Sequence, residues 1–255
     1  MRYFIDNIRN CFDFFLRNRI TFSRKNYYEK PQDISKVFDN DEQREWYSYF
    51  KEKYDCTLLE DSTLRNFTAN VYYLNIFDKF LTKKPKENLS ILDIGSKNWA
   101  YVKSEYVFFK SFANDFLLNG IELDAYRMYT NFYNRYEIAK FYIKGLENTN
   151  YIIGDLLKHN QKYDYIIWSL PFIVEYPLVK WGLPLKYFKP EEMLSHAYSL
   201  LNKGGEMLII NQGEEEYQIQ QALNKKLNLN SILFGEIEDK FGIFKNKRYC
   251  LKILK

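Results

Sequence analysis

The segment Leu89–Ser96 constrains the fold more than any other part of the chain. It reads Leu-Ser-Ile-Leu-Asp-Ile-Gly-Ser, a short apolar run that ends in an acid, a glycine and a small polar residue. A buried parallel strand is typically apolar in this way, and a glycine suits the tight turn that leaves its carboxyl end. Ligands bind at that end of the strands in open α/β sheets. The segment therefore predicts a parallel sheet with a ligand site beside it.

Apolar segments of strand length and amphipathic segments of helix length alternate from residue 89 onward. We expect strands at 90–94, 120–123, 151–153, 163–168, 206–211, 231–238 and 248–254, and helices at 102–118, 127–144, 190–201 and 214–227. No helix separates the last two strands, so these form a hairpin. The pattern predicts an α/β fold, a doubly wound and mostly parallel seven-stranded Rossmann-like sheet with a C-terminal β-hairpin.

Residues 1–88 have a different character, with many aromatic residues and no glycine. Two stripes of apolar residues recur there at helical spacing, one over 8–16 and one over 67–81. We therefore expect two domains, a helical N-terminal extension (1–88) and a Rossmann-like domain (89–255).

Composition bounds the class of protein. Over 255 residues the hydrophobic share is 46%, enough for a core, and the net charge of +4 permits a nucleic-acid partner without requiring one. No apolar run approaches the ~20 residues that span a bilayer, so we expect no membrane segment. The start of the chain lacks the pattern of a signal peptide. Cys11, Cys56 and Cys250 lie far apart, which fits reduced thiols in a cytoplasmic protein and no metal site.

Four segments, 91–95, 120–124, 153–156 and 200–210, carry a resemblance to a known family. Their motifs, order and spacing resemble those of class I S-adenosylmethionine-dependent methyltransferases, and the resemblance covers about residues 88–255. It implies S-adenosyl-L-methionine as the cofactor and methyl transfer as the reaction. It identifies neither the acceptor nor the oligomeric state.

The resemblance implies a set of cofactor-binding residues: Asp93, Gly95, Ser96, Lys97, Glu122, Asp155 and Leu156. An acid at the end of the second strand can accept hydrogen bonds from both ribose hydroxyls, which favours Glu122, with Asp124 as the rival. Asp155 can accept from the adenine amino group, or it can cap a short helix.

The first motif departs from the family pattern acid-x-Gly-x-Gly-x-Gly, because Lys97 and Trp99 replace the second and third glycines. These glycines normally let the backbone approach the ligand closely. One interpretation is that Lys97 or Ser96 meets the methionine carboxylate. The other is that the pocket is blocked and the protein is an inactive binding scaffold. Trp99 can also be simple core packing. A nicotinamide cofactor is disfavoured because its pyrophosphate needs a G-x-G-x-x-G loop.

The fourth strand ends in Ser169-Leu170-Pro171-Phe172. This partly resembles the Asn/Asp/Ser-Pro-Pro-Tyr/Phe motif of amino methyltransferases, with Leu170 in place of the first proline. The resemblance implies that Ser169, Pro171 and Phe172 act on an amine-bearing target, although a loop turn and a core lid explain the last two equally well. A small molecule and a nucleic acid both stay open as acceptor.

Overall fold

The computed structural model describes residues 2–21 and 26–255, and within these residues seven strands form one sheet. Their bounds are β1 Leu89–Ile94, β2 Phe116–Glu122, β3 Thr149–Ile153, β4 Tyr163–Ser169, β5 Leu201–Gln212, β6 Asn230–Ile237 and β7 Arg248–Leu254. The order is β3-β2-β1-β4-β5-β7-β6. Strands β1 to β5 pair in parallel, and β7 runs antiparallel to both β5 and β6. The predicted sheet with its terminal hairpin is confirmed.

The register brings the carboxyl ends of the parallel strands to one edge. Ile94 at the end of β1 pairs with Ile121 on one side and Trp168 on the other. Glu122 at the end of β2 pairs with Ile153 at the end of β3. The turns that follow these strands therefore meet at the same edge of the sheet.

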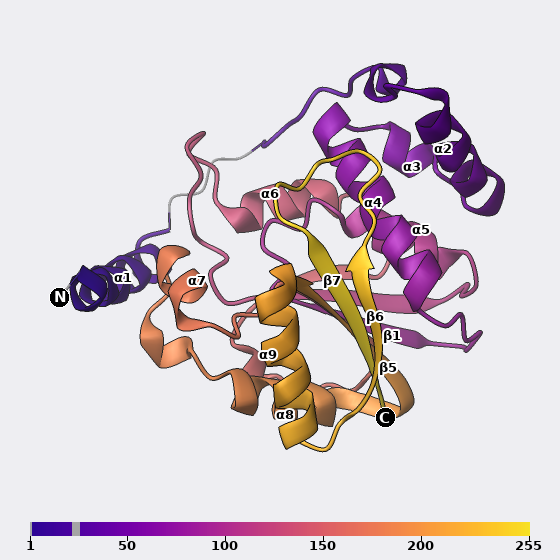
Figure 1. Cartoon of the computed structure of the whole chain (residues 1–255). Helices are drawn as coiled ribbons and strands as arrows, with labels where there is room; N and C mark the ends of the chain where they lie inside the picture. The colour runs from indigo at the N-terminus through magenta and orange to yellow at the C-terminus, as the bar shows by residue number, and fades with distance from the viewer. Residues whose placement is uncertain (1, 22–25) are drawn as a thin grey trace.

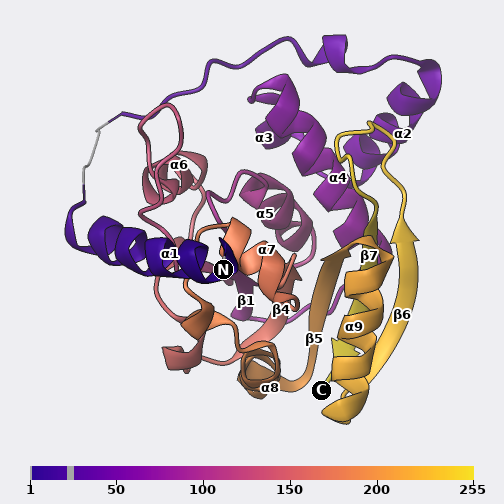
Figure 2. The same cartoon turned by 60° about the vertical axis from the view of Figure 1, so that its left-hand side comes forward.

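Helices cover both faces of the sheet (Figure 1; Figure 2). One face carries α4 (Leu64–Phe80), α5 (Val102–Lys110) and α6 (Arg135–Tyr142), and the other carries α8 (Pro190–Leu200) and α9 (Gly213–Lys226). Neighbouring β1 residues alternate between the two layers, since Ile91 packs in the first core and Leu92 in the second. Burial on both faces is why these strands are apolar almost throughout.

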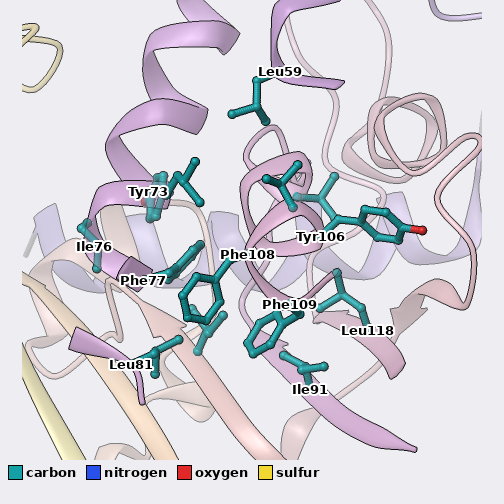
Figure 3. Packing of buried hydrophobic residues seen from close by; sticks show 14 of the residues in the cluster. Leu59, Tyr73, Ile76, Phe77, Leu81, Ile91, Tyr106, Phe108, Phe109 and Leu118 are labelled. Atoms are coloured by element: carbon teal, nitrogen blue, oxygen red, sulfur yellow. The ribbon is translucent and has the colours of Figure 1, made fainter. Parts of the chain in front are cut away.

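The core between the sheet and α4 and α5 is aromatic (Figure 3). The ring centroids of Phe77 and Phe108 lie 5.9 Å apart, those of Phe108 and Phe109 5.1 Å, and those of Phe109 and Tyr165 5.2 Å. Tilted and edge-to-face pairs of this kind stabilise beyond the area that they bury. Helix α4 comes from the predicted N-terminal extension, yet its side chains share the main core with the sheet.

The rest of the N-terminal segment holds α1 (Arg2–Arg19), η1 (Ile34–Val37), α2 (Asp41–Lys53) and α3 (Thr57–Glu60). In both views α1 lies at the side of the body beside α7 (Glu175–Lys180), apart from α2 and α3. Two short 3₁₀ turns, η2 (Leu156–Lys158) and η3 (Leu185–Tyr187), complete the elements. Among the described residues no helix is both long and apolar enough to cross a bilayer.

Three element boundaries differ from the prediction. The helix expected over 102–118 ends at Lys110, and residues 116–118 open β2 instead. The helix expected over 127–144 begins only at Arg135, where Asn134 and Glu137 form a capping box. The strand expected from 206 begins at Leu201, so Gly204 (φ +78°) lies within a strand rather than ending a helix. A short apolar run is compatible with both the helical and the strand period. Where the predicted helix or loop became a strand, pairing with a neighbouring strand decided the outcome.

Candidate functional site

A cavity of about 890 Å³ opens at the carboxyl edge of the parallel strands. Ligand pockets typically measure ~300–1,000 Å³. Eight of the ten predicted site residues line it: Gly95, Lys97, Glu122, Asp155, Leu156, Ser169, Pro171 and Phe172. The other two, Asp93 and Ser96, are fully buried behind the wall of the cavity. Side chains from four strand ends therefore converge on one hollow.

The loop after β1 keeps a glycine-like backbone at all three motif positions. The φ angles are +71° at Gly95, +58° at Lys97 and +49° at Trp99. This left-handed conformation costs a residue with a side chain about 1–2 kcal/mol, and such strain persists only where surrounding contacts impose it. The Gly95 N–H donates to the Ile121 carbonyl (2.9 Å), and the Lys97 N–H donates to Glu122 (2.8 Å). Lys97 and Trp99 therefore hold a left-handed backbone although each carries a large side chain.

Trp99 points away from the cavity into the core. Its indole is fully buried, and its Nε1–H donates to Glu105 (3.0 Å). A Cβ placed on Gly120 of β2 would lie 2.9 Å from three atoms of the indole ring, so the glycine makes room for it. Trp99 is core packing, and it does not block the cavity.

Glu122 fastens the first loop to the end of β2. Its Oε2 accepts from the Lys97 N–H (2.8 Å), and its Oε1 accepts from the Asp124 N–H (2.7 Å) and from Nη1 of Arg135 (3.2 Å). A carboxylate oxygen can accept two hydrogen bonds. Oε2 therefore still has capacity for a ligand hydroxyl at the cavity wall.

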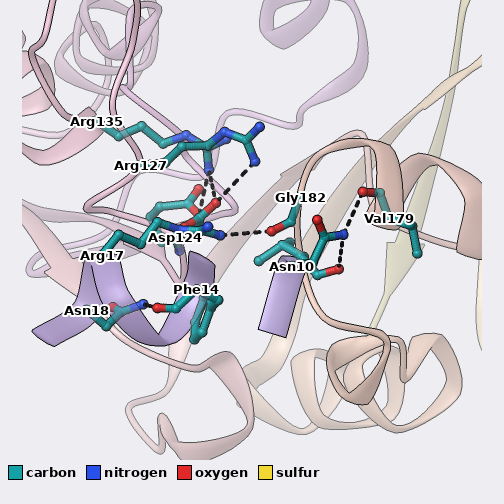
Figure 4. A network of polar contacts seen from close by, with 11 residues as sticks. Asn10, Phe14, Arg17, Asn18, Asp124, Arg127, Arg135, Val179 and Gly182 are labelled. Atoms are coloured by element: carbon teal, nitrogen blue, oxygen red, sulfur yellow. Dashed lines mark hydrogen bonds and ion pairs between the residues drawn. The ribbon is translucent and has the colours of Figure 1, made fainter. Parts of the chain in front are cut away.

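Asp124, the alternative to Glu122, does not line the cavity and is surrounded by three arginines (Figure 4). Arg17 Nε lies 2.5 Å from Oδ1, while Nη1 of Arg127 and of Arg135 lie 3.6 and 3.7 Å from Oδ2. Burial raises the pKa of Asp124, and the cations of Arg135 and Arg17 oppose the shift. Asp124 holds three cations around the end of β2, and of the two acids only Glu122 lines the cavity.

Asp93 forms a buried carboxyl pair with Glu105 of α5. Both side chains are fully buried, and apart from the Trp99 N–H few donors serve their oxygens. A buried carboxylate without donors is costly, so burial favours the protonated form of these acids. Burial raises the pKa of Asp93 to about 7, and burial together with Asp93 raises the pKa of Glu105 well above its usual range. The pair is structural, one layer behind the cavity.

Asp155, just after the end of β3, has a local structural role. Oδ1 of Asp155 accepts from the Leu157 N–H (3.0 Å) and caps η2, as one of the two interpretations expected. Asp155 nevertheless lines the cavity together with Gly154 and Leu156. The second oxygen and the neighbouring backbone are the groups available to a ligand there.

Lys97 is half-buried and lines the cavity. Its Nζ lies 4.6 Å from the ring centroid of Trp181, a residue that also lines the cavity. Burial, together with the charges of Arg135 and Arg65, lowers the pKa of Lys97 to about 8. An anionic ligand group would relieve this clustering of cations.

The end of β4 places a pair of hydroxyls on the cavity. Ser169 Oγ lies 2.9 Å from the hydroxyl of Tyr73 on α4, and the Tyr73 ring stacks on that of Tyr101 with centroids 4.1 Å apart. Leu170 has a φ of +59°. Proline is locked near −65°, so the first proline of the amino-methyltransferase motif could not sit in this backbone. The turn therefore differs from that motif although Ser169, Pro171 and Phe172 face the cavity.

No sequence pattern identified several of the residues that line the cavity. Tyr73 lies within the apolar stripe of α4, 96 positions before its partner Ser169, and Arg135 lies in the first turn of an unremarkable helix. The two histidines do not line the cavity: His196 contacts the His159 carbonyl, and His159 contacts Tyr163. In the part of the chain that the structure covers, no cluster of three acids, cysteines or histidines could hold a metal ion.

The strand order, the antiparallel β7 and the cavity at the carboxyl edge define a Rossmann-like fold of the methyltransferase type. No protein-family model matches the sequence. No curated protein matches it either. Among solved structures the chain is similar to a SAM-dependent methyltransferase from Aquifex aeolicus, with a TM-score of 0.47 and 13% identity over 88% of this chain and 97% of that one.

It is also similar to precorrin-6y C5,15-methyltransferase from Geobacter metallireducens (TM-score 0.47, 9% identity, 78% of this chain and 92% of that one). A third similar structure is the plantazolicin methyltransferase BpumL in complex with SAH (TM-score 0.47, 13% identity, 87% and 93% of the chains). Similarity at this level concerns the fold and leaves the acceptor undetermined.

Proposed function

We propose that the cavity binds S-adenosyl-L-methionine and that the protein transfers its methyl group to an acceptor. The observation that carries this proposal is the convergence of Glu122, Asp155 and the loop 95–97 on one cavity. A nucleoside needs acceptors for its ribose hydroxyls and its adenine amino group. An amino acid carboxylate needs a cation, and Lys97 lies on the same loop as the first glycine.

The available groups fit the cofactor from end to end. Asp155 and the backbone beside Leu156 would face the adenine, and the remaining capacity of Glu122 Oε2 would face the ribose. Lys97 would face the carboxylate. When bound, the sulfonium supplies an activated methyl group. The chain therefore has mainly to orient the acceptor and exclude water, so a catalytic histidine or cysteine is not required.

The acceptor would approach the end of β4. The Ser169–Tyr73 pair offers hydroxyls that can accept from or donate to an acceptor amine or hydroxyl, and Phe172 offers an aromatic surface. Seven basic and four acidic side chains line the cavity, so an anionic acceptor suits its charge: Arg65, Lys97, Arg135, Lys158, Lys186, Lys189 and Arg248 against Glu29, Glu122, Asp155 and Glu216. A small molecule and a nucleic acid both meet that description.

S-Adenosylhomocysteine is expected to raise the melting temperature of the purified protein. A ligand that binds only the folded state stabilises it by about 2.7 kcal/mol at a hundred times its Kd. Thermal unfolding would be recorded with this ligand, with S-adenosylmethionine and with NADH as the control. If only NADH shifts the melting temperature, the cofactor assignment is wrong. If no ligand shifts it at millimolar concentration, the chain is a methyltransferase-like binding scaffold.

Lys97→Met is expected to weaken S-adenosylhomocysteine binding about tenfold at neutral pH, because a hydrogen bond to a charged group contributes about 1.5–3 kcal/mol. The pKa of Lys97 is lowered to about 8, so the wild-type advantage over the variant should disappear as the amine loses its proton above that pH. Calorimetric titrations across this range would measure it. Lys110→Met, on the exposed side of α5, is the control. Equal affinities for Lys97→Met and wild type at pH 7 would remove Lys97 from the site.

A further inference from the structure

Helix α1 docks on the protein through its polar side. Asn10 Nδ2 donates to the carbonyls of Val179 (2.8 Å) and Leu183 (3.2 Å), and Arg17 donates to Asp124 and to the Gly182 carbonyl (2.9 Å; Figure 4). Asn7 accepts from the Leu185 N–H (2.8 Å), and the Tyr3 hydroxyl donates to Glu175 (3.0 Å). These contacts fix which side of the helix faces the body.

The opposite side of α1 is apolar and faces solvent. Five large side chains form this outer face, with exposed fractions of 66% for Phe4, 59% for Ile5, 54% for Ile8, 62% for Phe12 and 54% for Phe15. Their spacing keeps them on one side of the helix. None of them belongs to a hydrophobic core cluster, whereas Tyr3 and Phe14 of the docked side do.

This orientation is the reverse of what core packing produces. A helix on the surface of a globular protein turns its apolar stripe inward and its polar residues toward water. Here the polar residues make the internal contacts. A contiguous exposed apolar face of this kind marks an interaction site.

The dimensions of the outer face favour a lipid surface over a second copy of the chain. From Phe4 to Phe15 the helix advances only about 17 Å at ~1.5 Å per residue, so the outer face is a narrow strip that by itself presents less than the ~800 Å² of accessible surface per partner of a stable protein interface. A single amphipathic helix lying in the headgroup region is, by contrast, sufficient for binding to a bilayer surface.

Charge complementarity points to an anionic bilayer. Arg19 is exposed beside the outer face, and its guanidinium lies 5.2 Å from the ring centroid of Phe15. Arg9 is also exposed there and pairs with Asp6 (3.5 Å), a contact that a headgroup phosphate would replace. Arginines beside an apolar helix face attract anionic headgroups while the apolar side chains enter the interface. Because no described helix can span a membrane, the contact would lie in the plane of the surface.

We propose that the outer face of α1 binds the surface of an anionic lipid bilayer. Helix α1 is anchored on α7 and on the segment after it, and Leu178, Trp181 and Leu183 of this region line the cavity. Binding would therefore hold the wall of the cavity next to the bilayer. The proposal is independent of whether the cavity binds S-adenosylmethionine.

The test is flotation of the full chain with vesicles of phosphatidylcholine alone or with phosphatidylglycerol. Cys11 is exposed on α1, whereas Cys56 and Cys250 are buried, so an environment-sensitive thiol probe can be placed on α1 selectively. We expect flotation with the anionic vesicles, a blue shift of the probe on binding, and much weaker flotation with phosphatidylcholine.

The double variant Ile8→Ser/Phe12→Ser should lower the partition coefficient at least about tenfold, since burying a large apolar side chain contributes more than 1 kcal/mol. Arg9→Gln/Arg19→Gln should remove the preference for anionic vesicles. The matched control is Ile232→Ser/Leu233→Ser on β6, whose side chains are similarly exposed. Thermal unfolding would verify that each variant is folded.

Three results would overturn the proposal. The first is no flotation with anionic vesicles, and the second is flotation that Ile8→Ser/Phe12→Ser leaves unchanged. The third is a dimer in sedimentation equilibrium that the same variant converts to a monomer, which would assign the outer face of α1 to a second copy of the chain.

Discussion

Replacing Glu122 by glutamine is expected to weaken S-adenosylhomocysteine binding at least about tenfold and to lower the free energy of unfolding by about 3 kcal/mol, near the lower end of the 3–5 kcal/mol for breaking a buried ion pair. An amide cannot accept from both the Lys97 and Asp124 N–H groups, which Glu122 now serves with separate oxygens. Arg135 also loses one of its two counter-charges. The first loop is thereby released and the ribose loses a charged acceptor. Calorimetry and chemical denaturation would measure the two effects.

Glu206→Gln separates binding from stability. Glu206 is a buried acid of β5 that pairs with Lys84 (2.6 Å) and Lys252 (3.1 Å), and it does not line the cavity. We expect this variant to lose stability on a similar scale while it binds S-adenosylhomocysteine like the wild type. Normal binding by folded Glu122→Gln would show that Glu122 only holds the loop.

Asp93→Asn is expected to change how stability depends on pH. An acid whose pKa is raised on folding stabilises the protein below its unfolded pKa, and this contribution is lost as the pH rises through the folded pKa. For Asp93 these limits are an ordinary value of 3.8 and a folded pKa of about 7. The stability of the wild type relative to the variant should therefore fall between these limits, by on the order of 4 kcal/mol at ~1.4 kcal/mol per pKa unit.

The difference between the two proteins is the informative quantity. Folding lowers the pKa values of three other acids, Asp78, Asp164 and Glu206. Their contribution to the free energy of unfolding therefore grows as the pH rises, but it is the same in both proteins. Urea denaturation of wild type and variant at a series of pH values would measure this difference in the free energy of unfolding. Glu105→Gln should produce the same trend because it removes the other half of the pair. A difference that does not vary with pH would mean that folding does not raise the pKa of Asp93.

The fold was predictable because its signals are local. Each parallel strand is buried on both faces and therefore reads as a short apolar run, and the absence of a helix between residues 238 and 248 indicated the hairpin. The segments 111–118 and 201–205 were assigned wrongly because their apolar residues fit both the helical and the strand period. Residues 116–118 pair with Leu89, Ser90 and Ile91, a choice that depends on a distant strand.

The candidate site was predictable where a strand end carried it. Glu122 is the last residue of β2 and Asp155 comes two positions after β3, and parallel strands bring their carboxyl ends to one edge. The sequence favoured Glu122 but left Asp124, two positions on, as a rival. In the structure Glu122 lines the cavity, whereas Arg17, Arg127 and Arg135 surround Asp124, and Arg17 comes from a helix 107 positions away.

By itself the sequence determined the parallel sheet, its terminal hairpin and the edge at which a ligand site lies, since periodicity and turn residues act over a few neighbouring positions. Only the tertiary structure decided that Trp99 is core packing, that burial raises the pKa values of Asp93 and Glu105, that Tyr73 faces Ser169, and that α1 docks through its polar side. These contacts join residues from separate elements, and burial between the elements sets their charge and their partners.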